Sequence, residues 1–250
     1  SRKPVWYALR KLKGIQVHPG TAAKLLKIRH PDSQMTAHQI LLGGTLQVLG
    51  QPIGIGQGNN PTCQSARGIS MWSQHAPGKL LNYIIDAASS DNLYFRYEGE
   101  LLEAQKLPVG TTATFDFELD PVSIVLVPLL DRIYNEMMRQ AMVKHYQEDP
   151  HVSVNPAFYG HWIQTGFASA YDPIRHAIVD YERFVRLFLA SFHPEYNGGH
   201  HFIYPVPLGI FITSAKAEFV GFHAVSLQRI DQSPQGEWRA YFYNPNNEGR

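Results

Sequence analysis

The single cysteine of this chain lies in a local setting that favours nucleophilic chemistry. Cys63 follows the segment QGNNPT of residues 57–62, and the residues after it have the pattern of a helix. A helix N-terminus lowers the pKa of a thiol through unpaired N–H groups and the helix dipole, and the thiolate is the nucleophile. The same N–H groups, with the side-chain amide of Gln57, are suitable donors to an oxyanion. A lone cysteine is also a common buried filler, so Cys63 alone leaves both interpretations open.

His223 and Asn244 are candidates for the base and for the group that orients it, both of which a nucleophilic thiol requires. His223 lies in FHAVSL, residues 222–227, where a polar ring stands among apolar residues of a strand-like run. A core histidine with satisfied hydrogen bonds would show the same pattern. However, a hairpin centred near residue 234 would place Asn244 opposite His223 on one face of a sheet. A side-chain carbonyl beside an imidazole can fix its tautomer and orientation, as in a catalytic triad.

The elements that must position these residues follow from hydrophobic periodicity and from capping residues. We expect helices at residues 21–28, 33–48, 63–74, 78–88 and 130–146, and another at 173–192 with Asp172 as its cap. We expect strands at residues 93–97, 111–118, 122–127, 218–230 and 238–244, with a turn at 231–237. Helices come first and strands late, which favours an α+β fold with a helical part packed on a sheet part.

Composition excludes several classes of function. The 22 Lys and Arg residues balance 21 Asp and Glu, so a nucleic-acid or anionic-membrane partner has no electrostatic support. No apolar run reaches the roughly 18 residues that a membrane span needs. One cysteine cannot form an internal disulfide, which favours the cytoplasm or another reducing compartment.

A metal site or a bound cofactor is not expected. The chain contains no Cys-x-x-Cys pair and no His-Glu-x-x-His motif, and the adjacent His200 and His201 cannot easily share one ion. The glycines at positions 54, 56 and 58 match neither the dinucleotide-binding fingerprint nor the phosphate-binding loop of nucleotide hydrolases.

Taken together, the candidate residues resemble those of the papain-like cysteine proteases. That family carries a Gln six positions before a Cys that begins the central helix, then a His in a strand, and finally an Asn or Asp at the end of a later strand. Gln57 and Cys63 keep this spacing, FHAV of residues 222–225 is similar to the His-Ala-Val strand, and YNPN of residues 243–246 stands in the third position. The C-terminal motif is closest to bacterial effector and toxin-type proteases, in which an Asp occupies the position of Asn244. Gln64 departs from the family, which has Trp after the nucleophile.

The resemblance implies a papain-like α+β fold, in which a helical subdomain with the Cys helix packs against an antiparallel sheet subdomain with the His and Asn. It implies one catalytic domain over residues 1–250. Its segments would be a helical N-terminal elaboration (1–50), the oxyanion loop and Cys helix (51–92), mixed strands and long helices (93–217) and the His/Asn hairpin (218–250).

The implied activity is that of a cysteine peptidase acting on a protein or peptide substrate. Cys63 would attack an amide carbonyl as a thiolate, His223 would protonate the leaving amine, and Asn244 would orient His223. The Cys63 N–H and the Gln57 amide would hold the oxyanion. The same constellation also performs deamidation, other amide hydrolysis or acyl transfer, and a degenerate relative would be a non-catalytic binding module. The similarity to bacterial effectors adds delivery into a host or target cell as a further hypothesis. The oligomeric state is not predicted.

Overall fold

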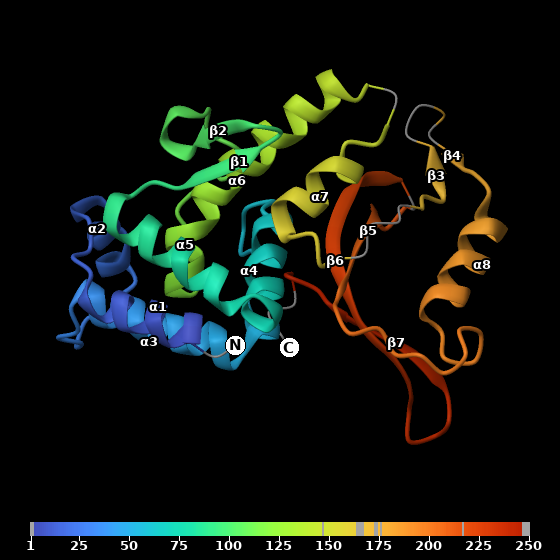
Figure 1. The fold of residues 1–250 in the computed structure, drawn as a ribbon, viewed down its shortest axis with the longest axis horizontal. Helices are drawn as coiled ribbons and strands as arrows, with labels where there is room; N and C mark the ends of the chain where they lie inside the picture. The colour runs from blue at the N-terminus through green and yellow to red at the C-terminus, as the bar shows by residue number, and fades with distance from the viewer. Residues whose placement is uncertain are drawn as a thin grey trace.

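Helices make up most of the chain before residue 163, as Figure 1 shows. The computed structural model describes residues 3–146, 148–163, 168–172, 175, 177–216 and 218–246. The helices of this part are α1 (Lys3–Gly14), α2 (Pro19–Lys27), α3 (Ala37–Gly50), α4 (Cys63–His75), α5 (Pro77–Ser90), α6 (Pro121–Lys144) and α7 (His151–Tyr159). Short 3-10 turns lie at η1 (Pro52–Gly54) and η2 (Ala104–Lys106), and β1 (Tyr94–Tyr97) pairs antiparallel with β2 (Glu100–Glu103).

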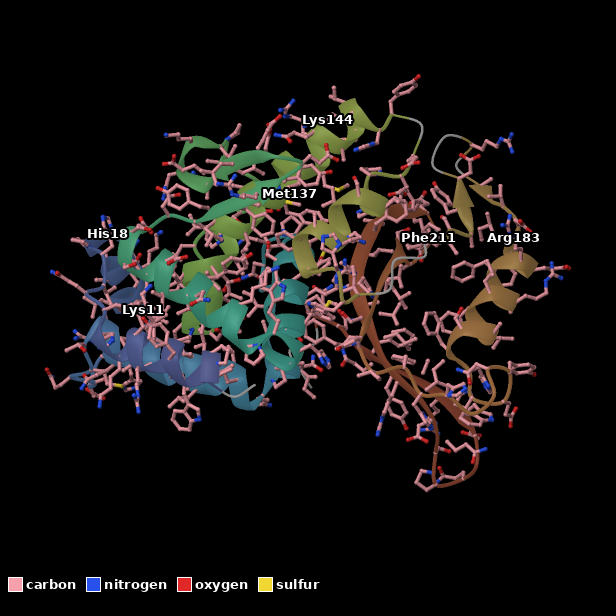
Figure 2. The ribbon with its side chains drawn as sticks, viewed as in Figure 1. Lys11, His18, Met137, Lys144, Arg183 and Phe211 are labelled. Carbon is pink, nitrogen blue, oxygen red and sulfur yellow. The ribbon has the colours of Figure 1, made fainter. Side chains whose placement is uncertain are left out.

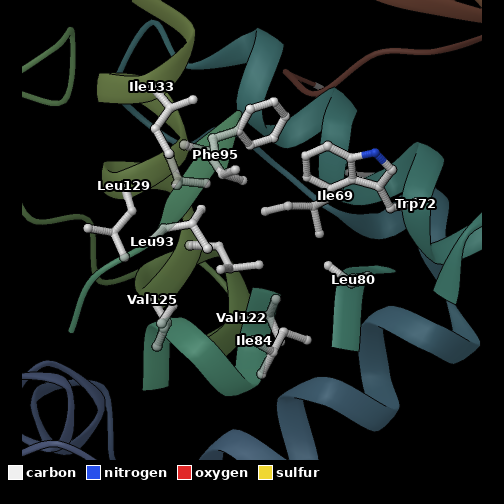
Figure 3. Close-up of a cluster of buried hydrophobic side chains, with 14 of the residues drawn as sticks. Ile69, Trp72, Leu80, Ile84, Leu93, Phe95, Val122, Val125, Leu129 and Ile133 are labelled. Atoms are coloured by element: carbon white, nitrogen blue, oxygen red, sulfur yellow. The ribbon is translucent and has the colours of Figure 1, made fainter. Parts of the chain in front are cut away.

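The main core of the molecule lies inside this helical part. Figure 3 shows side chains of α4, α5, β1 and α6 converging, among them Ile69, Ile84, Phe95 and Ile133. Each of these buried side chains contributes about 1.5–3 kcal/mol relative to an exposed one. In Figure 2, Met137 of α6 lies in the interior, whereas Lys144 and Arg183 lie at the periphery. α4 is buried along most of its length, so the helix that begins at Cys63 is held rigidly.

The second part of the chain is built around a three-stranded antiparallel sheet of order β5-β6-β7. Its elements are β3 (Tyr171–Asp172), β4 (Ala177–Ile178), α8 (Tyr181–Phe192), β5 (Val206–Thr213), β6 (Phe219–Gln232) and β7 (Trp238–Tyr243). A smaller apolar cluster joins Phe192 of α8 to Val206, Leu227 and Ile230 of the sheet. In Figure 1 the sheet lies between α4 and α7 on one side and α8 on the other. The fold is therefore α+β, with β6 packed beside α4.

The strand predicted at residues 122–127 is wrong, because these residues form the first turns of α6. Asp120 is the N-cap, and its carboxylate accepts hydrogen bonds from the backbone N–H groups of Val122 and Ser123, both at 2.9 Å. Pro121 occupies the first helical position, where a missing N–H has no cost. All six residues are buried, so the run is apolar on every side and lacks the periodicity of an amphipathic helix. None of the described helices, α6 included, has the length and apolarity needed to cross a membrane.

Two further predictions need correction. Residues 111–118 form no strand; they are an irregular segment whose hydrogen bonds go to Asn60 and Asp131. The helix predicted at 173–192 begins only at Tyr181, after β4 and a left-handed residue, Asp180, and positions 173, 174 and 176 lie outside the described residues. The predictions for α4, α5 and the hairpin of β6 and β7 are confirmed to within a few residues. The sequence prediction omitted α1, β2, α7, β3 and β5.

Candidate active site

The structure places Cys63 at the first residue of α4, with free backbone donors around it. The preceding Thr62 makes no capping hydrogen bond with its side chain, and its carbonyl accepts from the N–H groups of Ser65 and Ala66 at 3.0 and 3.1 Å. Among the described residues, the N–H groups of Cys63 and Gln64 have no acceptor. The thiol is half-buried. The helix end therefore directs partial positive charge and unpaired donors to the sulfur and to any group bound beside it.

His223, in the middle of β6, contacts both of the residues predicted to accompany it. Its Nε2 lies 2.7 Å from Oδ1 of Asn244. Its ring also interacts with the thiol of Cys63, and this interaction raises the pKa of His223. Because Nε2 is engaged by the amide, Nδ1 is the ring nitrogen left for the sulfur. His223 as a whole is only 5% exposed, so few orientations are open to its ring. The structure thus brings Cys63, His223 and Asn244 together from α4, β6 and the end of β7.

The hairpin that brings Asn244 to His223 differs in register from the prediction. Ser226 pairs with Tyr243, and a bulge lies between Leu227 and Arg229. Continued by one residue, this register sets Asn244 level with Val225 and not with His223. The offset is two residues, and side chains two apart point to the same face of a sheet, so the amide still reaches the imidazole diagonally.

The contacts of Cys63 and His223 favour the thiolate–imidazolium pair. Burial alone raises the pKa of the Cys63 thiol. The hydrogen bond with His223, a second from the Ala224 N–H and the positive charges of His223 and Arg67 outweigh it, and the pKa lies below its usual value. For His223, the hydrogen bond with Cys63 raises the pKa above its usual value, although burial opposes it, and Asn244 adds to the rise. The two shifts move a proton in the same direction, from sulfur to ring.

Gln57 is buried in the loop before α4 and is tied to the segment that carries Asn244. Its backbone N–H donates to the carbonyl of Pro245 at 3.0 Å, and two residues earlier the Ile55 carbonyl accepts from the Tyr243 hydroxyl at 2.6 Å. Its side-chain Nε2 donates to the carbonyl of Asn60 at 3.2 Å. One of the two amide hydrogens is thus used within the loop, and the other has no acceptor among the described residues. Oε1 has no partner among the described residues.

Two residues that sequence reasoning missed hold this loop in place. The Asn60 amide accepts from the N–H groups of Ala113 and Thr114 and donates to the Thr114 carbonyl at 2.9 Å. The Asp116 carboxylate accepts from the Asn59 N–H at 2.6 Å. The irregular segment of residues 111–118 therefore holds the loop that contains Gln57 and leads into Cys63 through these hydrogen bonds. The only sequence signal was the turn-forming composition of residues 58–61.

Gly58→Ala should destabilise the protein, because this turn needs a glycine. Gly58 has φ of +63°, and a Cβ there would overlap the Asp116 carboxylate. We expect a loss of about 1–2 kcal/mol in the free energy of unfolding, measured in urea. Gly43→Ala is the control: Gly43 lies exposed in α3 with open space around it, and we expect a gain of about 0.5–1 kcal/mol. Equal effects of the two variants would contradict this account of the loop.

Arg67 and Tyr159 also belong to the site, although neither was predicted. Gln64, which follows Cys63, accepts hydrogen bonds at its Oε1 from Arg67 and from the Tyr159 hydroxyl, both at 2.5 Å. Arg67 also reaches the carbonyls of Leu208 and Val225 in β5 and β6. Gln64 thus takes part in a polar network between α4, α7 and the sheet. An Arg on a helix is usually exposed, so this contact has no signal in the sequence.

The described residues contain no group of three or more His, Cys, Asp or Glu side chains arranged to hold a metal ion. The arrangement of Cys63, His223 and Asn244 is suited to attack on a carbonyl without a metal or an organic cofactor. Comparison of the chain with protein-family models, with curated proteins and with solved structures finds no match.

Proposed function

We propose that this protein is a cysteine hydrolase that cleaves peptide amides, with Cys63 as nucleophile, His223 as acid and base, and Asn244 as the residue that orients His223. The observation that carries the proposal is the position of the His223 ring, which hydrogen-bonds with Asn244 at 2.7 Å and interacts with the thiol of Cys63 so that the pKa of the thiol falls and that of the ring rises. A buried filler cysteine has no need of an oriented imidazole. Nor does a structural histidine need a thiol at a helix N-terminus.

The chemistry follows from these contacts. The Cys63 thiolate attacks the carbonyl carbon, and the new oxyanion accepts from the free Cys63 N–H and from the second amide hydrogen of Gln57. The C–N bond breaks as the His223 imidazolium gives its proton to the leaving amine, which leaves a thioester on Cys63. Water then attacks the thioester while His223 takes its proton, and the carboxylic acid leaves as the thiolate returns.

We also propose that the fold is papain-like. Three features support this: the nucleophile begins a buried central helix, the base and its orienter lie on an antiparallel sheet, and they occur in that order along the chain. The tie from Gln57 to Pro245 supports it further, because it joins the oxyanion loop to the strand end that carries Asn244.

Product analysis tests the reaction. The protein and its Cys63→Ala variant are incubated with a proteome-derived peptide library and with intact proteins, and the products are analysed by mass spectrometry. New chain termini that only the wild-type protein produces support the peptidase. Released ammonia with an unbroken backbone would show that the activity is that of a deamidase and not of a peptidase. A product joined to an added amine would show an acyltransferase. If no product forms and iodoacetamide alkylates Cys63 no faster than free cysteine, the enzyme proposals fail and a binding module is the remaining hypothesis.

Gln57→Ala should lower kcat by roughly 10²- to 10³-fold with little change in KM, because an oxyanion donor acts mainly in the transition state. The measurement is steady-state kinetics on a peptide from the library. Gln51→Ala is the matched control, since Gln51 is an exposed residue in the same loop region, and it should retain wild-type kcat. A Gln57→Ala variant with unchanged kcat would remove Gln57 from the oxyanion site.

A further inference from the structure

Arg67 is a buried cation that no carboxylate neutralises. It lies one turn after Cys63 on α4 and is only 2% exposed. Each of its five N–H groups has a neutral acceptor: the carbonyls of Leu208 and Val225, Oε1 of Gln64, and the Tyr159 hydroxyl, which accepts twice. No described residue forms an ion pair with it. Its hydrogen bonds are satisfied, but its charge is not, and a buried charge is costly unless an opposite charge lies near.

The titratable groups around Arg67 leave one candidate for that opposite charge. Tyr159 from α7, Tyr134 from α6 and Tyr243 from β7 all interact with it electrostatically. Burial raises the pKa of Tyr159 to about 12, and burial raises the pKa of the other two phenols further, so all three remain neutral near physiological pH. His223 from β6 is cationic or neutral. Cys63 is the remaining group, and it is the one that the proposed function requires as an anion.

We propose that Arg67 is a positioning residue whose fixed positive charge has the Cys63 thiolate as its counter-charge and whose guanidinium fastens the Cys63 helix to the strands beside His223. This inference rests on the proposed thiolate chemistry. Arg67 donates to the carbonyl of Val225 at 3.0 Å, and Val225 lies two residues after His223 on β6. Its hydrogen bond to Gln64 joins it to the residue next to Cys63. The guanidinium therefore contacts both the residue next to Cys63 and the strand that carries His223.

Arg67 gives the site a second positive charge beside that of the His223 ring. The His223 imidazolium supports the thiolate only until the ring loses its proton, whereas a guanidinium stays charged at every accessible pH. The positive charge of Arg67 also opposes protonation of His223 and so limits the rise in its pKa. Arg67 therefore acts on both members of the pair in the direction that keeps the thiolate available and the ring able to exchange its proton.

The test is the apparent pKa of Cys63, taken from the pH dependence of alkylation by iodoacetamide, which needs no substrate. We expect Arg67→Met to raise it by roughly one pH unit or more. Arg67→Lys keeps the charge but loses the fork of hydrogen bonds, so it should hold the pKa near the wild-type value while lowering the free energy of unfolding. Tyr159→Phe removes the hydroxyl and keeps the cation, so it too should hold the pKa of Cys63 near the wild-type value while lowering the free energy of unfolding. Equal pKa values in wild type and a folded Arg67→Met would overturn the inference and leave Arg67 a structural fastener.

A second measurement uses the wild-type protein and stands even if Arg67→Met does not fold. Iodoacetate carries a negative charge and iodoacetamide does not. A cation near the sulfur therefore raises the ratio of the iodoacetate rate to the iodoacetamide rate above the ratio measured for free cysteine. At a pH where His223 is neutral, we expect the raised ratio to persist because Arg67 remains charged. A ratio that falls to the free-cysteine value would overturn the role of Arg67. The proposed function fails separately, if the wild-type thiol has the pKa of free cysteine.

Discussion

His223→Ala should lower kcat/KM on a library-derived peptide by roughly 10⁴- to 10⁶-fold, the largest loss expected of any variant that keeps the thiol. In the proposed mechanism His223 serves two steps: it holds the thiolate before attack, and it protonates the leaving amine. Without the imidazole the thiolate loses its hydrogen bond and its nearest cation, and the amine must leave unprotonated. The measurement is steady-state kinetics, with circular dichroism to verify the fold.

Two further variants make this result specific. His223→Gln keeps side-chain volume and a polar group in the buried position, and it should be as inactive as the alanine variant because it cannot exchange a proton. His201→Ala changes an exposed histidine of the same part of the chain and should keep wild-type activity. A loss of less than tenfold in both His223 variants would show that the reaction, if present, uses another base.

Asn244→Ala should lower kcat/KM by roughly 10²- to 10⁴-fold, while Asn244→Asp should stay within about tenfold of wild type. The Oδ1 of Asn244 fixes the tautomer and the plane of His223 through the 2.7 Å hydrogen bond, and only alanine removes that acceptor. Aspartate adds a negative charge beside the ring. It should raise the pKa of His223 and move the alkaline limb of the kcat/KM profile to higher pH.

The control for this pair is Asn246→Ala. The Asn246 backbone N–H also donates to Oδ1 of Asn244, at 3.0 Å, and that bond survives the loss of the exposed side chain. The variant should retain wild-type kinetics. Equal losses in Asn244→Ala and Asn244→Asp would contradict an orienting role for Oδ1 and would indicate that Asn244 only maintains the strand end.

The elements predicted well are those whose boundaries are encoded locally. The break between α4 and α5 follows from Pro77 and Gly78, and the final hairpin follows from its turn-rich centre. The prediction for the start of α6 was wrong because a helix buried on all sides has the same apolar run as a buried strand. In addition, Asp120-Pro121 fits both a turn and a helix start. β5 was missed because Pro207 and Gly209 disfavour a strand. Both residues are tolerated here since β5 is an edge strand of the sheet.

The candidate site divides in the same way. Gln57, Cys63, His223 and Asn244 were selected because each stands at a recognisable place in a local motif, and the structure places the last three in contact. Asn60, Asp116 and Arg67 act through partners more than 50 residues away in the chain, as in the bond from Arg67 to Val225 (|i−j| = 158). A single sequence contains no local signal for such pairs. The residues proposed to carry the chemistry were predictable, and those that hold the geometry were not.

The most direct test of the central claim is the pH dependence of Cys63 alkylation by iodoacetamide in the wild-type protein and in His223→Ala. The claim is that His223 keeps Cys63 as a thiolate. In the wild type, the rate should already be high below the usual thiol pKa of about 8.5. In His223→Ala the midpoint should move to that value or above it, because burial then acts against the thiolate with less opposition. The same midpoint in both proteins, or a wild-type midpoint at the usual value, would contradict the account.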